Sequence, residues 1–223
     1  MGIMEFLGSV GAAIRAVLSL NPEAIEWIWS DPDRLAIAFS VAILAGASLM
    51  LGDSVILYLN RLRGWRFALT LLLNGVGMAL LYAVQAGVIA LIGPWIAGYS
   101  PGLELILTGA MLATAPLVFG MFVLIPYFGP GIAVCLQVWA MVALWMINGV
   151  LFATDRWTAL WITLLAWLCM QVLSRAFATP VARVGDWIWR LISGRPSMIT
   201  GSDLLSGHLF LPLEQRFSRE AAL

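Results

Sequence analysis

A few polar side chains interrupt otherwise apolar stretches of the sequence, and their chemistry needs an explanation. Asp53 is a carboxylate inside the first long apolar stretch, and Asn74 is an amide inside the second. An arginine-rich turn connects the two stretches, and both residues lie at a similar distance from it along the chain. A charged group in hydrocarbon costs about 2.5–3.5 kcal/mol on insertion scales, so it needs a partner. We therefore expect an intramembrane polar cluster of Asp53, Asn74, Gln137 and Gln171 in one half of the membrane.

Two interpretations of this cluster stay open. It could be a cation or proton site or a polar groove for a substrate headgroup, or it could only hold helices together through hydrogen bonds of about 0.6 kcal/mol each. No second acid or histidine is expected at comparable depth to receive a proton, so a proton relay is not predicted. Tyr82, Gln85 and Asn148 are expected to be isolated, and no role is assigned to them.

The sequence predicts neither an enzyme nor a metal or cofactor site. It has no nucleophile elbow, phosphate loop or metal-ligand spacing. All 12 basic residues are arginine, so lysine Schiff-base cofactors are excluded, and His208 is the only histidine. Cys135 and Cys169 lie inside apolar stretches and are expected to be buried thiols at the level of the lipid, without a disulfide between them. A bound lipid or pigment stays open because neither would require a motif.

The composition excludes a soluble globular domain. Apolar residues make up 62% of the chain and charged residues 11%, against roughly 45–50% and 25% in soluble domains. The net charge is zero, which gives no basis for nucleic-acid binding. We predict an all-α polytopic membrane protein whose partners are membrane lipids and other integral membrane proteins. Its five transmembrane helices are expected at Leu35–Leu59, Phe67–Ile92, Leu103–Leu124, Gly131–Phe152 and Trp157–Leu173.

Amphipathic patterns flank the spans on both sides. The first 20 residues and the segment after Pro22 repeat apolar residues at helical spacing, as does the segment from Val181 to Leu191, so we expect interfacial helices there. This divides the chain into an N-terminal interfacial segment (1–30), a five-helix domain (31–177) and an amphipathic helix with an extended tail (178–223). Gly93-Pro94 is expected to end the second span.

The distribution of arginine predicts the orientation in the membrane. Arg15, Arg34 and Arg156 fall on the N-terminal side of the five spans, and the other nine arginines fall on the opposite side. The positive-inside tendency therefore places the C-terminus in the cytoplasm and the N-terminus outside. We expect a bacterial inner or internal membrane.

Two further features point to contacts with neighbours. Small residues at four-residue spacing in the second span would let another helix approach closely, either within the bundle or from a separate subunit. This helix-packing face comprises Gly75, Ala79, Ala83 and Gly87. The C-terminal tail is too apolar to stay free in water. Its expected docking residues are Leu204, Leu205, Leu209, Phe210 and Leu211.

The order of several short motifs resembles a known family. Asn21-Pro22-Glu23-Ala24-Ile25 precedes Asp31-Pro32 at the first span, and Leu124-Ile125-Pro126-Tyr127-Phe128-Gly129-Pro130-Gly131-Ile132 precedes Trp139 and Ala159. Over roughly residues 20–175, this arrangement is similar to the Yip (Ypt-interacting-protein) domain family, particularly its prokaryotic members. The resemblance implies a non-enzymatic five-helix membrane protein. Eukaryotic relatives associate with Rab-type GTPases through a cytosolic N-terminus, whereas the N-terminus predicted here is outside.

Three functions follow as expectations. The first is a membrane scaffold, assembly factor or accessory subunit of a larger complex. The second is a small transporter or channel for an ion, lipid or neutral solute, centred on Asp53 and Asn74. The third is a trafficking factor that recruits a small GTPase, and it rests on family resemblance alone.

Overall fold

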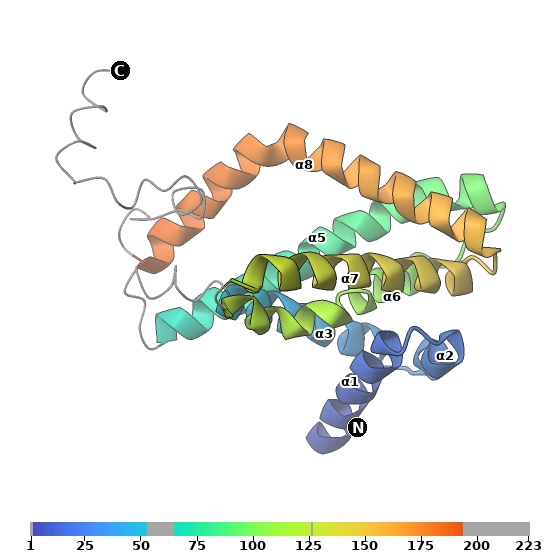
Figure 1. The fold of residues 1–223 in the computed structure, drawn as a ribbon, viewed down its shortest axis with the longest axis horizontal. Coiled ribbons are helices and arrows are strands. Elements are labelled where there is room, and N and C mark those ends of the chain that lie inside the picture. The colour runs from blue at the N-terminus through green and yellow to red at the C-terminus, as the bar shows by residue number, and fades with distance from the viewer. Residues whose placement is uncertain (1, 53–64, 126, 194–223) are drawn as a thin grey trace.

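The architecture follows from long apolar segments that satisfy their backbone hydrogen bonds internally as helices. The computed structural model describes residues 2–52, 65–125 and 127–193. Within those ranges every regular element is a helix (Figure 1). In chain order they are α1 (Ile3–Leu18), α2 (Pro22–Ser30), α3 (Arg34–Gly52), α5 (Trp65–Ala97), α6 (Leu103–Leu112), the 3₁₀-helix η1 (Ala115–Leu124), α7 (Gly129–Leu151) and α8 (Arg156–Ser193).

The prediction of five spans and an all-α fold is confirmed. Five described segments are long and apolar enough to cross a membrane. At 1.5 Å per residue, even the shortest approaches the roughly 30 Å of a bilayer core. They are Arg34–Gly52, Phe67–Ala97, Leu103–Leu124, Gly129–Leu151 and Arg156–Ala176.

The expected break at Gly93-Pro94 is wrong, because α5 continues through Pro94 to Ala97. A proline near the end of a helix removes one backbone donor but leaves few later turns to disrupt. The helix ends at Gly98, whose φ of +70° places it in the left-handed region and whose amide donates to the Pro94 carbonyl at 2.9 Å. This is a glycine C-cap, so Gly98 ends the span.

The third span changes helix type halfway along. α6 ends at Leu112, and the chain continues as η1. Pro116 explains the change, because proline lacks the amide that an α-helix would use and its ring would clash with the preceding turn. The Thr114 hydroxyl donates to the Met111 carbonyl at 2.7 Å, and the Ser48 hydroxyl of α3 accepts from the Met121 amide at 2.9 Å. The neighbouring helix thus satisfies part of the η1 backbone.

The packed side of the bundle consists of α3, α5, α6 and η1. A Cβ added at Gly46 would lie 2.7 Å from the Gly75 Cα, and one at Gly75 would lie 2.6 Å from the Ile43 carbonyl oxygen. A Cβ at Gly109 of α6 would lie 2.7 Å from Ile147 of α7. The backbones therefore approach so closely that only glycine fits without movement of the neighbours.

The N-terminal helices lie beside the spans (Figure 1). Val10, Ala13 and Val17 of α1 are buried against the bundle, while Ile3 and Leu7 remain exposed. Asn21 caps α2 by accepting from the Glu23 amide at 3.1 Å, with Pro22 as the first helical residue. Both segments predicted to be amphipathic helices here are helical, and the C-terminal half of α1 covers the bundle with its apolar face.

α8 runs far past the end of the fifth span. It continues from Arg156 to Ser193 as one helix and bends partway along (Figure 1). Pro180 lies inside this helix, and the missing amide of a proline is a common cause of a bend. The segment predicted as a separate amphipathic helix after residue 178 is therefore continuous with the last span.

Candidate functional site

A groove at membrane depth is the first candidate site. It has a volume of about 470 Å³ and lies where α8 packs against both α5 and α7. Each of these three helices contributes one glutamine to its wall, namely Gln85, Gln137 and Gln171. Apolar side chains such as Leu81, Val138 and Trp167 make up most of the remaining surface. Aspartate, glutamate and arginine are absent from the groove lining in the described part of the chain.

The groove glutamines lie well inside the apolar spans. Gln137 is 14 residues before the end of α7 and Gln171 is 15 residues after the start of α8, so each lies about 20 Å along its helix from the α7–α8 turn. Both side chains are exposed, and Gln85 is half-buried. None of the three side-chain amides donates or accepts a hydrogen bond within the described residues. The groove thus presents free amide groups where lipid tails offer no partner.

The structure corrects the predicted cluster of Asp53, Asn74, Gln137 and Gln171. It brings Gln137 and Gln171 to one groove, but Asn74 is not part of the lining. The Asn74 amide instead donates to the Gly46 carbonyl at 2.6 Å, which joins α5 to α3. Asp53 lies outside the described residues. Asn74 therefore belongs to the packed side of the bundle, where Gly46 and Gly75 already bring the two backbones together.

Three residues that were expected to be isolated line the groove or join two helices. Gln85 and Tyr82 line the groove, three residues apart on α5 and therefore on one helix face. Asn148 is buried and donates from its amide to the Thr163 hydroxyl at 2.9 Å, linking α7 to α8. The Thr163 hydroxyl in turn donates to the Ala159 carbonyl at 2.9 Å. The spacing of Tyr82 and Gln85 was the available signal, but only packing reveals that α7 and α8 meet that face.

The column of small residues on α5 is packed inside the bundle at one end and open at the other. Gly75 contacts α3, and Ala79 is buried in the core. Ala83 is half-buried against the core, whereas a Cβ added at Gly87 would meet nothing within 4 Å. The column is therefore an internal packing surface at Gly75 and Ala79 and becomes open by Gly87.

Two other sequence predictions concern the cysteines and the tail. Cys135 and Cys169 are free, as expected, but both are exposed on the surface of the protein, so neither is buried inside the bundle; their position within the apolar spans agrees with the expected lipid level. Each lies two residues before a groove glutamine, which turns it to nearly the opposite side of its helix. The predicted docking residues Leu204, Leu205, Leu209, Phe210 and Leu211 lie outside the described residues.

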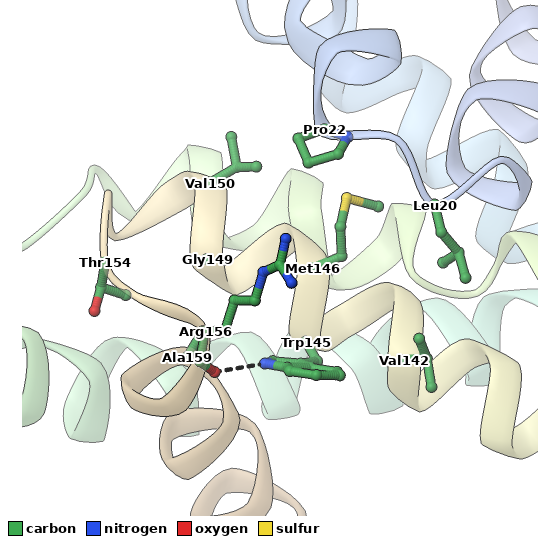
Figure 2. A pocket seen from close by; sticks show the side chains of 10 residues that line it. All are labelled: Leu20, Pro22, Val142, Trp145, Met146, Gly149, Val150, Thr154, Arg156 and Ala159. Carbon is green, nitrogen blue, oxygen red and sulfur yellow. Dashed lines mark hydrogen bonds between the residues drawn. The ribbon is translucent and has the colours of Figure 1, made fainter.

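A second hollow of about 460 Å³ lies at the end of the spans, next to the α7–α8 turn (Figure 2). Val142, Met146 and Val150 of α7 form an apolar wall, and Leu20 and Pro22 approach from the α1–α2 connection. Figure 2 shows the Arg156 side chain extending from the start of α8 into the hollow between Gly149 and Met146. The hollow therefore combines an apolar wall with one cationic group, and we refer to it as the Arg156 pocket.

Hydrogen bonds fix the backbone that carries Arg156. The Arg156 carbonyl accepts from the Trp145 indole at 2.8 Å (Figure 2). The Asp155 carboxylate caps α8 by accepting from the amides of Trp157 at 3.0 Å and Thr158 at 3.3 Å and from the Thr158 hydroxyl. Hydrogen bonds from Thr158, with a smaller one from Trp157, hold the pKa of the Asp155 carboxyl below its ordinary value. Asp155 is thereby engaged with the helix end.

The chain is locally strained on two sides of the Arg156 pocket. Leu20, which lines it, has a φ of +51°, and Ala153, next to the lining residue Thr154, has a φ of +46°. L-residues with side chains rarely adopt this left-handed region, and such strain persists only where surrounding structure holds it. The two turns that frame the pocket are therefore held by their tertiary contacts.

Arg34 provides a contrast near the start of α3. Its guanidinium pairs with Glu104 of α6, with Nη2 2.9 Å from Oε1, and donates to the Trp29 carbonyl at 2.9 Å. For the Arg156 guanidinium, the described residues provide no ion pair and no hydrogen-bond acceptor. Arg34 is therefore used to join α2, α3 and α6, whereas Arg156 is available to a ligand.

The fold and its hollows define a multi-span helical membrane protein. Among residues 2–52, 65–125 and 127–193, no group of three or more His, Cys, Asp or Glu side chains is placed to hold a metal ion. The predictions of no cofactor and no catalysis stay predictions. No family model, curated protein or solved structure matches this chain. The similarity to the Yip family thus rests on the short motifs alone.

Proposed function

We propose that this protein is a non-enzymatic scaffold, assembly factor or accessory subunit of a larger membrane protein complex. The observation that carries the proposal is the groove with Gln85, Gln137 and Gln171. An amide without a hydrogen-bond partner in an apolar medium costs roughly 2–7 kcal/mol, depending on the reference state. A polar side chain from a neighbouring transmembrane helix would remove that cost.

The composition of the groove favours a helix over an ion. Its wall is mostly apolar and, within the described residues, holds no charged side chain, so it offers little to a desolvated ion. Interhelical hydrogen bonds in membranes contribute about 0.6 kcal/mol on average, and three amides together would fix the register of a docked helix. The expected occupant is a transmembrane helix that carries a serine, threonine, asparagine or glutamine facing the groove.

Removal of the groove amides tests this proposal. Membranes that contain the parent protein or the double variant Gln137→Leu with Gln171→Leu are extracted in mild detergent, and the extracted particles are weighed by native mass spectrometry. The parent is expected in a hetero-complex, and the double variant largely as a single chain. Cys135→Leu with Cys169→Leu is the matched control, because it changes the same two helices away from the groove and should leave the complex intact.

Extraction of the parent protein as a lone chain would contradict the proposal. Equal recovery of the complex with both double variants would show that the glutamines do not hold the partner. Circular dichroism of each variant checks that the helices are retained.

A carrier for a neutral, hydrogen-bonding solute is the second candidate, and the three glutamines in an uncharged groove favour it. Asn74, which was expected to take part, already donates to the Gly46 carbonyl. Glycerol flux into reconstituted vesicles is the test. Under this alternative Gln137→Leu abolishes the flux, and absence of flux through the parent protein would dismiss a glycerol-like cargo.

The orientation and the family resemblance lead to further proposals. We infer from the arginine distribution that the N-terminus lies outside and the C-terminus in the cytoplasm of a bacterial inner or internal membrane. Accessibility of single introduced cysteines near each terminus to an impermeant reagent tests this. Recruitment of a small GTPase follows only from the resemblance to Yip proteins, and a pull-down with a small GTPase tests it.

A further inference from the structure

The Arg156 pocket lies where a bilayer changes from hydrocarbon to headgroups. Arg156 is the first residue of the fifth span, and the pocket includes the last turns of α7. Trp157 is 74% exposed next to Arg156, and tryptophan at the end of a span is typical of the interface. Lipid phosphates lie immediately outside the hydrocarbon, so a cation at this depth meets them.

The wall of the pocket has an apolar part and a charged part, which match the acyl chains and the phosphate of a phospholipid. Val142, Met146 and Val150 provide an apolar surface along α7, and the Arg156 guanidinium provides the charge. Figure 2 shows that this side chain extends over the pocket instead of away from it. A guanidinium presents several N–H donors in a planar fork that matches phosphate oxygens.

The Arg156 charge is not neutralised within the described structure. The nearest carboxylate in sequence, Asp155, accepts from the first amides of α8 and the Thr158 hydroxyl, and it forms no ion pair with Arg156. Near the start of α3, by contrast, Arg34 is paired with Glu104. The pocket therefore carries a net positive charge beside an apolar wall.

We propose that the Arg156 pocket binds a phospholipid, with the phosphate on the Arg156 guanidinium and the glycerol and upper acyl chains against Val142, Met146 and Val150. The site is independent of the glutamine groove, since the two hollows share no lining residue. Bound lipid would fill the space between the α1–α2 connection and the α7–α8 turn, and so would hold these two strained turns together.

Lipid titration by native mass spectrometry tests the proposal. The intact protein is stripped of lipid in detergent and then titrated with phosphatidylglycerol, with diacylglycerol of the same chains, or with inorganic phosphate. Phosphatidylglycerol is expected to bind at least about tenfold more tightly than diacylglycerol, because a hydrogen-bonded charge contributes that much. Arg156→Gln should remove this advantage, and Arg156→Lys should restore part of it.

Two controls keep the test specific. Arg15→Gln removes another exposed arginine that does not line the pocket, so phosphatidylglycerol binding should be unchanged. Gly149→Leu tests whether the volume of the Arg156 pocket is needed, because it fills the pocket and leaves the Arg156 guanidinium in place. A Cβ at Gly149 meets only the Ala159 Cβ at 3.6 Å, so the first carbon fits and the rest of the side chain enters the pocket. This variant should also lose phosphatidylglycerol.

Three results would overturn the proposal. Equal binding of diacylglycerol would mean that the pocket is only apolar. Displacement of phosphatidylglycerol by inorganic phosphate at the same concentration would mean that the ligand is a free anion. Unchanged phosphatidylglycerol binding in both Arg156→Gln and Gly149→Leu would locate the lipid elsewhere on the protein.

Discussion

The two sides of the bundle differ in how they are filled. Over an apolar stretch of 18 residues in each span, the third span, on the packed side, has 67% of these residues buried within the protein, whereas the fifth span has 22%. On the packed side, glycines bring the backbones of α3 and α5 together and the Asn74 amide is bonded to Gly46. On the open side, α5, α7 and α8, together with Leu49 of α3 and Leu117 of η1, line a groove whose glutamine amides form no hydrogen bond in the described structure.

This difference separates residues that hold the fold from residues available to neighbours. Polar groups inside a bilayer are normally paired, and Asn74 follows that rule within the chain. Gln137 and Gln171 depart from it in the region where the bundle is least covered. Depth in the membrane alone therefore does not identify a functional polar residue. Whether its side chain already has a hydrogen-bond partner within the chain distinguishes a residue that holds the fold from one that is available to a neighbour.

The largest expected effect is a loss of stability when the packing of α3 against α5 is disturbed and the open side is left unchanged. Gly75→Ala should lower the free energy of unfolding by about 1–3 kcal/mol, because its Cβ would lie 2.6 Å from the Ile43 carbonyl oxygen. Gly87→Ala, three turns along the same helix, meets open space and should be neutral or stabilise by up to about 1 kcal/mol. Unfolding titrations in mixed micelles measure both. Equal destabilisation by the two variants would refute the assignment of the packed and open sides.

A smaller effect tests how the open side is joined. Asn148→Ala and Thr163→Val each remove one partner of the buried hydrogen bond between α7 and α8. A double-mutant cycle should give a coupling free energy of about 0.6 kcal/mol, the average for such bonds in membranes. Strictly additive effects would mean that this bond does not help to position α8 beside the groove.

The smallest effect concerns the cap at the Arg156 pocket. Asp155→Ala should lower the melting temperature slightly at neutral pH, whereas Asp155→Asn should nearly retain it because asparagine also caps helices. The pKa of the Asp155 carboxyl is lowered in the folded protein, so its stabilisation is present above the unfolded pKa and disappears as the pH falls through the folded pKa. The difference from the alanine variant should therefore vanish in strong acid. A difference that persists there would exclude the charged cap as its cause.

Apolar length was sufficient to predict the five spans from the sequence. The end of the second span and the change of helix type in the third were harder to predict, because each depends on the conformation of a single glycine or proline. Gly98 in the left-handed region ends α5, although Pro94 comes first. Pro116 changes the third span to a 3₁₀-helix without ending it, since Ser48 of α3 satisfies part of its backbone.

The candidate site could be predicted only in part. Gln137 and Gln171 stood out because amides are rare in such apolar stretches, and they do share a groove. Gln85 and Tyr82 join them because of the face that α5 turns toward α8, which no local pattern encodes. Arg156 entered the prediction only through the orientation, because its pocket forms from the α1–α2 connection and the α7–α8 turn, more than a hundred residues apart.

The most direct test of the central claim is site-specific photocrosslinking in native membranes. A photoreactive residue replaces Val138 in the groove or, as a control, Leu44, which is exposed on α3 outside it. Position 138 is expected to give one discrete protein adduct that is lost when Gln137 and Gln171 are leucine, and position 44 to give none. Adducts of the same size and yield at both positions, or a position 138 adduct that survives loss of both glutamines, would contradict a docking role for the groove.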